Sequence, residues 1–226
     1  MKTQALIALL AATCLITNAA HAASATFDVS FTATSYAVDS DDTFSDLLAQ
    51  HLLGTPISST SVVAVDNIDT SLYAGNISGD YSVMMSTTLN IGVAGDYTFQ
   101  LGTDWGRGGG VALIDTDTNM IMDELVTDDD IWWGYNWNHP DVIETTYTLA
   151  EGLYTISWIG FEGCCAGSST VRFAYENNAF STLDLTNIAP YVVPIPAPVY
   201  LFGTGLLALV GVRRRAETAG DDGVRA

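Results

Sequence analysis

Basic residues are scarce in this chain of 226 residues, which has 7 Lys and Arg against 26 Asp and Glu. Between Ser24 and Pro196 there are 23 acidic residues and only two basic ones, Arg107 and Arg172, and no lysine. Such a charge distribution repels phosphate backbones, so we expect no nucleic-acid partner. Two interpretations of the acidity stay open: a merely soluble surface, and a surface that attracts cations.

Familiar catalytic motifs are also missing. The sequence has no nucleophile elbow, no zinc-protease helix and no phosphate-binding loop. Paired carboxylates, which glycoside hydrolysis uses, occur by chance at this density of acids. We therefore expect a non-enzyme with no catalytic residues, and a glycoside-active enzyme is the least favoured alternative.

Two hydrophobic segments frame the chain. The first follows Lys2 and ends in Ala-His-Ala at 20–22, the pattern of a secretory signal peptide over residues 1–22, with cleavage after Ala25 as the alternative. The second runs without interruption from Val199 to Val212. Counted back to Ile195 it reaches 18 residues, just long enough to cross a bilayer, and three arginines follow it. Positive charge beside a span stays in the cytoplasm, so we expect a cytoplasmic tail at 216–226 and an exported body at 23–190.

The C-terminal segment, residues 191–215, resembles the PEP-CTERM sorting domain of Gram-negative bacteria in the order and spacing of its residues. The residues that carry this resemblance, and the sorting role it implies, are Val193, Pro194, Pro196, Ala197, Phe202, Gly203, Gly205, Arg213, Arg214 and Arg215. The resemblance implies two processing partners, signal peptidase and an exosortase. It also implies an inner-membrane anchor through the C-terminal helix before sorting to the cell surface or extracellular matrix. A permanent single-pass anchor is the alternative.

Short alternating runs dominate the exported body. Examples are 25–38, 97–101 and 171–175, and Gly, Asp and Asn bound most of them. This pattern predicts an all-β fold, an antiparallel and jelly-roll-like β-sandwich. One exception, 42–54, has apolar residues at helical spacing and predicts a short helix. Residues 182–190 are typical of a last strand or a linker.

Part of the body, 82–176, resembles the protective-antigen-like β-sandwich domain of secreted adhesins and glycosidases. The resemblance rests on a strand followed by Asp104-Trp105-Gly106, a strand ending at Ile114-Asp115, and two strands around Glu151-Gly152 that we expect to pair. It implies carbohydrate or matrix binding without catalysis, with extracellular polysaccharide as the partner and Asp104 and Trp105 as ligand-binding candidates.

Four aromatic residues gather between 132 and 137. Exposed indole rings beside carboxylates and amides can stack on sugars, which makes Trp132, Trp133, Tyr135 and Trp137 candidate ligand-binding residues. Aromatics also fill sandwich cores, and in a strand the last three would share one face. Of these two interpretations, burial in the core is the favoured one.

Cys164 and Cys165 are the only cysteines outside the signal peptide. Exported thiols tend to oxidise, and Gly163 and Gly167 relax the backbone beside them. We expect a strained vicinal disulfide at the tip of a hairpin; intermolecular disulfides and two free thiols are the alternatives. The Cys-Cys-Ala-Gly block resembles the CCXG group of PEP-CTERM proteins, from which no activity follows.

Asp115, Asp117 and Asn119 alternate like the first ligands of a calcium loop. A helix-loop-helix site also needs Gly and Glu at its sixth and twelfth positions, where this chain has Met120 and Val126. Two interpretations stay open, a looser calcium site and a polar β-turn without a metal, and no other cofactor is expected.

The sequence thus favours an exported carbohydrate- or matrix-binding module. The main alternative is a structural matrix or biofilm protein without a specific ligand.

Overall fold

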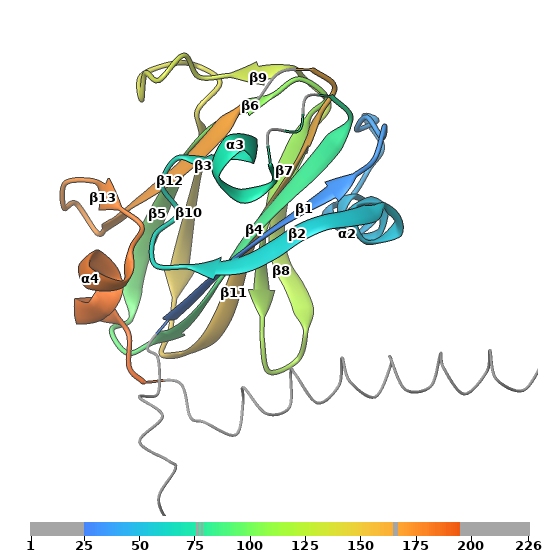
Figure 1. Ribbon diagram of the computed structural model, residues 1–226. Helices are drawn as coiled ribbons and strands as arrows, with labels where there is room; N and C mark the ends of the chain where they lie inside the picture. Colours follow the sequence, from blue (N-terminus) through green and yellow to red (C-terminus); the bar gives the residue numbers. More distant parts are fainter. Residues whose placement is uncertain (1–24, 76, 78, 165–166, 195–226) are drawn as a thin grey trace, which may run out of the picture. The chain divides into compact units, whose positions relative to one another are not determined.

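Two antiparallel sheets form the body of the protein (Figure 1). The computed structural model describes residues 25–75, 77, 79–164 and 167–194. These belong to one unit, Ser24–Pro194. The predicted signal peptide at 1–22 and the predicted sorting residues Pro196, Ala197, Phe202, Gly203, Gly205, Arg213, Arg214 and Arg215 lie outside the described residues.

The first sheet has six strands in the order β2-β1-β4-β11-β7-β8. Their bounds are β1 Ala25–Ala33, β2 Thr55–Val62, β4 Tyr81–Ile91, β7 Gly109–Asp115, β8 Met120–Thr127 and β11 Gly152–Glu162. In the second sheet the order is β10-β5-β12-β13, and β3 pairs with β12. These strands are β3 Ile68–Asp69, β5 Gly95–Gly102, β10 Ile143–Leu149, β12 Ser168–Tyr175 and β13 Ser181–Thr182. A small third sheet joins β6 Asp104–Trp105 to β9 Ile131–Trp132.

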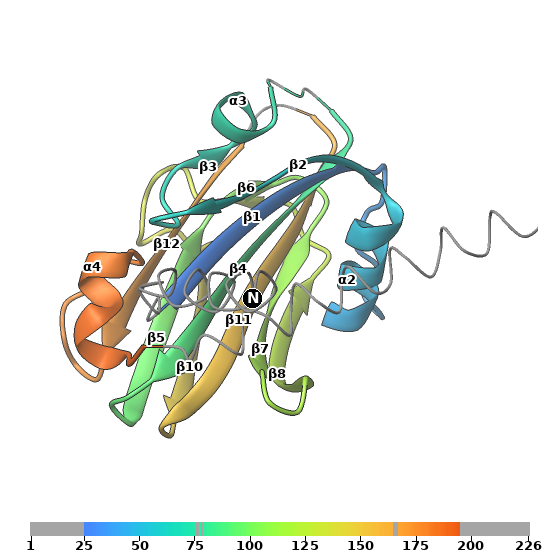
Figure 2. The ribbon, with the colours of Figure 1, turned by 60° about the horizontal axis from the view of Figure 1, so that its bottom comes forward.

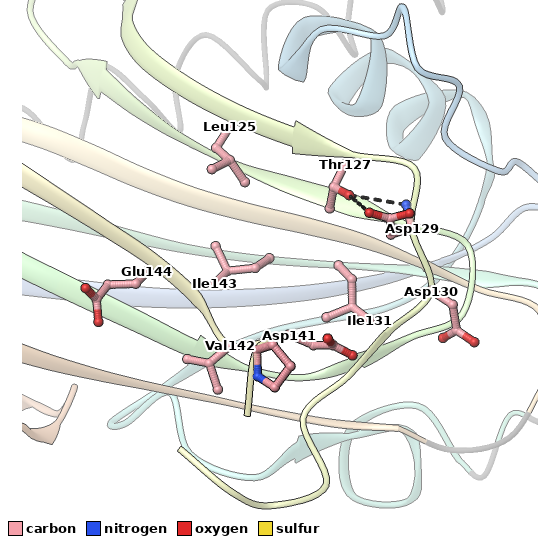
Figure 3. Close-up of a pocket in the computed structure, with 10 residues that line it drawn as sticks. Leu125, Thr127, Asp129, Asp130, Ile131, Asp141, Val142, Ile143 and Glu144 are labelled. Atoms are coloured by element: carbon pink, nitrogen blue, oxygen red, sulfur yellow. Dashed lines mark hydrogen bonds between the residues drawn. The ribbon is translucent and has the colours of Figure 1, made fainter. Parts of the chain in front are cut away.

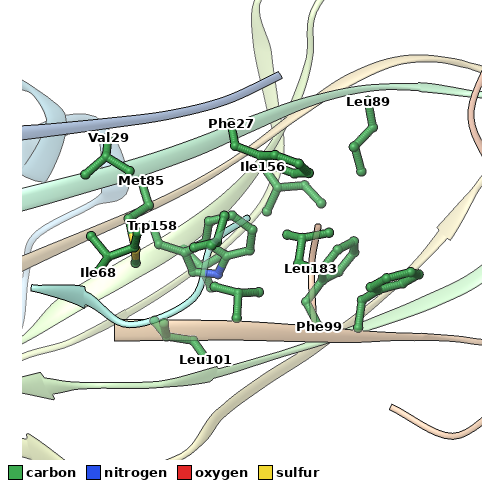
Figure 4. Close-up of a cluster of buried hydrophobic side chains, with 14 of the residues drawn as sticks. Phe27, Val29, Ile68, Met85, Leu89, Phe99, Leu101, Ile156, Trp158 and Leu183 are labelled. Carbon is green, nitrogen blue, oxygen red and sulfur yellow. The ribbon is translucent and has the colours of Figure 1, made fainter. Parts of the chain in front are cut away.

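The main core lies between the two large sheets (Figure 4). Alternate residues of β1 and β4 point inward, among them Phe27, Val29, Met85 and Leu89, because successive side chains of a strand face opposite sides. Phe99 and other apolar residues of the second sheet meet them. The expected antiparallel, sandwich-like all-β fold is confirmed.

A second, smaller core lies on the outer face of the six-stranded sheet, under α2 (Phe44–Leu53). Phe44 and Leu47 of this helix pack there against Ile159 and Phe161 of β11. The predicted helix is present, and Thr43 and Asp46 cap its first turn reciprocally. Figure 2 shows α2 far from α4 (Leu185–Ile188), which lies near β12.

Consecutive strands often change sheets, and this corrects two sequence-based predictions. β10 and β11 flank the turn at Glu151-Gly152 as expected, but β10 pairs with β5 whereas β11 pairs with β4 and β7. β12 likewise pairs with β5 rather than with β11. β11 and β12 therefore belong to different sheets and do not form the expected hairpin.

The end of the described body contains more than the expected strand or linker. After β13, the chain forms α4 and a short 3-10 helix, η1 (Ala189–Tyr191). Val193 then donates its backbone N–H to the carbonyl oxygen of Asn90 over 2.8 Å, and the Asn90 amide donates to the carbonyl oxygen of Pro194 over 3.1 Å. These bonds hold Val193 and Pro194, the first two of the predicted sorting residues, against the end of β4.

Among the residues that the structure describes, no helix is both long and apolar enough to span a membrane.

Candidate functional site

The aromatic segment after β9 is a series of turns and not a strand. Backbone bonds of 3.0, 2.8 and 3.1 Å run from Asn136 to Trp133, from His139 to Asn136 and from Val142 to His139. Gly134 and Tyr135 both have positive φ, at 58° and 56°. The turns break the alternation, so the aromatic side chains do not share one buried face.

Trp133 anchors this segment. It is 6% exposed, and its backbone N–H donates to the carbonyl oxygen of Thr103 over 3.1 Å. Its ring lies against Gly102, where a Cβ atom would overlap it. The ring centroids of Tyr135 and Trp137 lie 5.4 and 4.6 Å from the centroid of Trp133. Burial in the core, the favoured sequence interpretation, is thus wrong for Tyr135, which is 72% exposed.

Four chain segments, one of which carries these rings, line an open cleft of about 400 Å³, which we name the aromatic cleft. Its lining residues are Asp66, Asn67, Trp133, Tyr135, Trp137, Thr170, Arg172, Phe180 and Thr182. They come from the loop before β3, the segment after β9, strand β12, and β13 with the residue before it.

Asp66 and Asn67 are held at the rim of the cleft by Thr170. The Thr170 hydroxyl accepts the Asn67 backbone N–H over 2.9 Å and donates to the Asp66 carboxylate over 3.3 Å. Asn67 has φ 49°, a conformation that Asn tolerates better than most residues. A carboxylate and an amide thereby line the same cleft as the exposed ring of Tyr135.

Arg172 of β12 lines the aromatic cleft. Its guanidinium carbon is 4.1 Å from the ring centroid of Trp137 and 4.6 Å from that of Phe180. Its Nε donates to Gln100 over 2.7 Å. Burial lowers the pKa of Arg172, and Glu144 acts in the opposite direction. At neutral pH the guanidinium remains charged, since its ordinary pKa is far above 7.

Three sequence-predicted ligand residues lie outside the lining of this cleft. Trp105 is 1% exposed and belongs to the main core, with its ring against Gly160 and Gly109, so its assignment as a ligand residue is wrong. Trp132 is 56% exposed, and its ring lies 6.1 Å from that of His139. Asp104 is half-buried on β6; burial, then Glu162 and Asp130, raises the pKa of its carboxyl group.

A second cleft of about 400 Å³ opens between β8 and β10 (Figure 3). Apolar residues line it together with the carboxylates of Asp129, Asp130, Asp141 and Glu144. The Thr127 hydroxyl accepts the backbone N–H of Asp129 there and donates to the Asp129 carboxylate, as the dashed lines show. Glu144 also accepts a bond from Gln100, which connects this cleft to Arg172.

Glu162, the last residue of β11, holds the start of the segment that leads to β12. This carboxylate is 3% exposed and accepts the backbone N–H groups of Gly106, Gly163 and Cys164 over 2.9, 2.7 and 2.9 Å. Cys165 lies outside the described residues. The vicinal disulfide therefore stays a prediction.

The calcium candidates lie at the end of β7, which is Asp115, and in the turn before β8. Asp115 accepts the backbone N–H of Thr118 over 2.9 Å, and this bond is the main cause that lowers the pKa of the carboxyl group. Asn119 has φ 55°, as turn residues often do. Among the described residues no group of three or more His, Cys, Asp or Glu side chains could hold a metal ion. Calcium binding by Asp115, Asp117 and Asn119 stays a prediction.

No family model matches this chain, and neither does any curated protein. Several solved structures are similar to it. The PA14 sugar-binding domain of an RTX adhesin has 13% identity and a TM-score of 0.44, with 71% of this chain and 96% of that chain covered. For the PA14 domain of the antifreeze protein MpAFP, identity is 11%, the TM-score is 0.48, and coverage is 71% and 87%.

The Epithelial Adhesin 6 A domain from Candida glabrata, in complex with Galb1-3GlcNAc, has 10% identity and a TM-score of 0.45, with 71% and 84% covered. Similarities at this level carry no argument about the function of this chain. The aromatic cleft must be judged from its own residues.

The sequence identified the aromatic side of this cleft and missed the rest. Asp66, Asn67, Arg172 and Phe180 come from segments distant in sequence from the tryptophans. One signal pointed to Arg172, since it is one of only two basic residues in the body.

Proposed function

We propose that the exported body is a non-catalytic carbohydrate-binding module whose site is the aromatic cleft. The observation that carries the proposal is the convergence of the exposed ring of Tyr135 and the half-buried rings of Trp137 and Phe180 with polar groups in one open cleft. Tyr135 and Trp137 offer ring faces to the C–H faces of a sugar. Asp66 accepts hydrogen bonds from sugar hydroxyl groups, Asn67 donates and accepts them, and Arg172 donates them.

Preorganisation supports this function. The Thr170 bonds fix the rim, the Gln100 bond fixes Arg172, and contact with Gly102 fixes Trp133. A site ordered before binding loses less conformational entropy when the ligand arrives. A sugar presenting one apolar face and several hydroxyl groups fits such an arrangement.

A glycan array with the full-length protein tests the proposal. We expect binding to a defined set of glycans, and loss of about tenfold or more in affinity for Trp137→Ala and Tyr135→Ala, which is about 1.4 kcal/mol per variant. Trp132→Ala is the matched control, because Trp132 is exposed but does not line the cleft. Equal loss in all three variants would contradict the assignment of the cleft.

Absence of binding to any glycan on the array, together with self-association of the protein, would favour the alternative, a structural matrix or biofilm protein without a specific ligand.

We also propose that the chain is exported by a signal peptide at 1–22 and sorted by an exosortase through the PEP-CTERM segment at 191–215. The support is the order and spacing of the sorting residues and the arginines that follow the apolar run. Replacing Arg213, Arg214 and Arg215 with Gln should weaken membrane retention and processing, because the orientation signal is lost. Fractionation of the native host measures this, and normal surface delivery of the variant would refute the sorting role.

A further inference from the structure

Arg172 carries a positive charge that nearby carboxylates leave unpaired. The described residues contain two basic side chains, Arg107 and Arg172. Arg107 forms an ion pair with Asp80, with 2.7 Å between the guanidinium and the carboxylate oxygen. No carboxylate of the described residues lies within ion-pairing distance of Arg172, in a body with 23 acidic residues.

The orientation of the guanidinium is fixed before any ligand binds. Glu144, Gln100, Arg172 and Thr182 are register neighbours on four adjacent strands, so they form one row across the second sheet. In this row Gln100 accepts from Nε of Arg172 and donates to Glu144. The rings of Trp137 and Phe180 hold the guanidinium by cation–π contact.

Only one of the five guanidinium N–H groups is used by these bonds. The terminal nitrogens are left for the cleft that the side chain lines. Their fork geometry matches the two oxygens of a carboxylate, and such charge-assisted, bidentate bonds are stronger than neutral ones. A hydroxyl group satisfies the fork less well, because it offers one oxygen and no charge.

We propose that the sugar bound in the aromatic cleft bears a carboxylate, as uronic acids do, and that Arg172 binds this carboxylate. This inference rests on the proposed carbohydrate-binding function and names its ligand class.

The acidity of the body restricts the ligand further. Asp66 lines the same cleft, and the surrounding charge is strongly negative, so a densely charged polyanion is repelled. A glycan with isolated carboxylates among neutral sugars brings one negative charge to Arg172 and few to the rest of the surface. The carboxylate is then bound at Arg172, while the neutral part of the sugar contacts Tyr135 and Trp137.

Calorimetric titration of the full-length protein with methyl glucuronide and methyl glucoside, which differ at one carbon, tests the inference. We expect tighter binding of the glucuronide, and for Arg172→Gln a loss of about ten- to a hundredfold in glucuronide affinity with a much smaller loss for the glucoside, so that the preference for the glucuronide disappears. Arg107→Gln is the matched control, since it changes the net charge equally, and thermal denaturation verifies that both variants fold. We expect Arg107→Gln to retain the preference for the glucuronide.

The outcomes separate the inference from the proposed function. Equal affinity of the two sugars, with no effect of Arg172→Gln on their ratio, would overturn the inference and leave carbohydrate binding in place. If Arg172→Gln lowers the affinity for both sugars by the same factor, Arg172 only positions Trp137, and the inference is again overturned. Absence of binding by either sugar and by the whole glycan array would overturn both.

Discussion

The indole ring of Trp133 lies directly against Gly102, so closely that a Cβ atom on that glycine would overlap the ring. Gly102 ends β5, a strand of the second sheet, whereas Trp133 belongs to the segment after β9. Trp133 in turn contacts Tyr135 and Trp137. The missing side chain at position 102 therefore sets the position of the aromatic cleft on the sheet.

Gly102→Ala should displace Trp133 and weaken glycan binding, because the new methyl group occupies the place of the ring. We expect a red shift of tryptophan fluorescence and a loss of affinity comparable to that of Trp137→Ala. Far-ultraviolet circular dichroism should stay unchanged, since the strands persist. Wild-type affinity in a folded Gly102→Ala protein would show that this contact does not shape the site.

Trp105 and Tyr135 should give opposite effects when replaced. Trp105→Ala removes a buried ring and should lower the free energy of unfolding by about 3–5 kcal/mol. Tyr135→Ala removes an exposed ring and should change stability by less than about 1 kcal/mol while weakening glycan binding. Urea denaturation and glycan titration of both variants measure the two effects. Strong destabilisation by Tyr135→Ala would contradict its placement at the surface.

His51 should make the protein sensitive to mild acid. This residue of α2 is buried among the hydroxyl groups of Ser30, Thr32 and Ser82, and burial lowers its pKa from 6.5 to about 4. The unfolded chain therefore binds more protons between these two values. The contribution of His51 to the free energy of unfolding is present above pH 6.5 and is lost as the pH drops toward 4. The free energy of unfolding falls by about 2 kcal/mol between pH 7 and pH 5 for this reason.

Denaturation of the wild type and of His51→Asn across this pH range isolates the contribution of His51. The variant should be less stable at pH 7, because hydrogen bonds are lost, and its stability should depend less steeply on pH. Parallel pH profiles for the two proteins would be inconsistent with a neutral, buried His51.

Glu162→Gln should loosen the crossover between the sheets. The carboxylate accepts three backbone N–H groups, and an amide replaces one of its two acceptor oxygens with a donor. We expect the free energy of unfolding to fall by about 1–3 kcal/mol and hydrogen exchange to become faster at Gly163 and Cys164. Glu151→Gln, in an exposed turn, is the matched control and should change neither the free energy of unfolding nor the exchange rates.

Cys164 and Cys165 should be linked to each other in the exported protein. The intact mass of the non-reduced monomer should be lower than that of the reduced chain by about two hydrogens. Peptide mapping should place both sulfur atoms in one peptide. Two alkylatable thiols, or a covalent dimer as the main species, would exclude the vicinal bond.

The sequence alone determined the elements that depend on local chemistry. Alternation in residues such as Tyr97, Phe99 and Leu101 indicated strands, because a sheet buries one side of each strand. Apolar residues at helical spacing in 42–54 indicated α2, because a helix buries the side chains that recur along one of its faces. The deficit of basic residues likewise predicted that no nucleic acid binds, without any knowledge of the fold.

Only the tertiary structure decided which strands pair and which side chains meet. β11 and β12 are separated by a short segment and resembled a hairpin, yet each adds to a different sheet, since burial of both inner faces outweighs proximity in sequence. Trp105 and Tyr135 looked alike as candidates, but close packing against Gly160 buries the first, and a turn with positive φ exposes the second. The aromatic cleft joins Asp66, Trp137, Arg172 and Phe180 across more than a hundred residues. Contacts over such distances leave no periodic trace in the sequence, because the sheets bring these segments together.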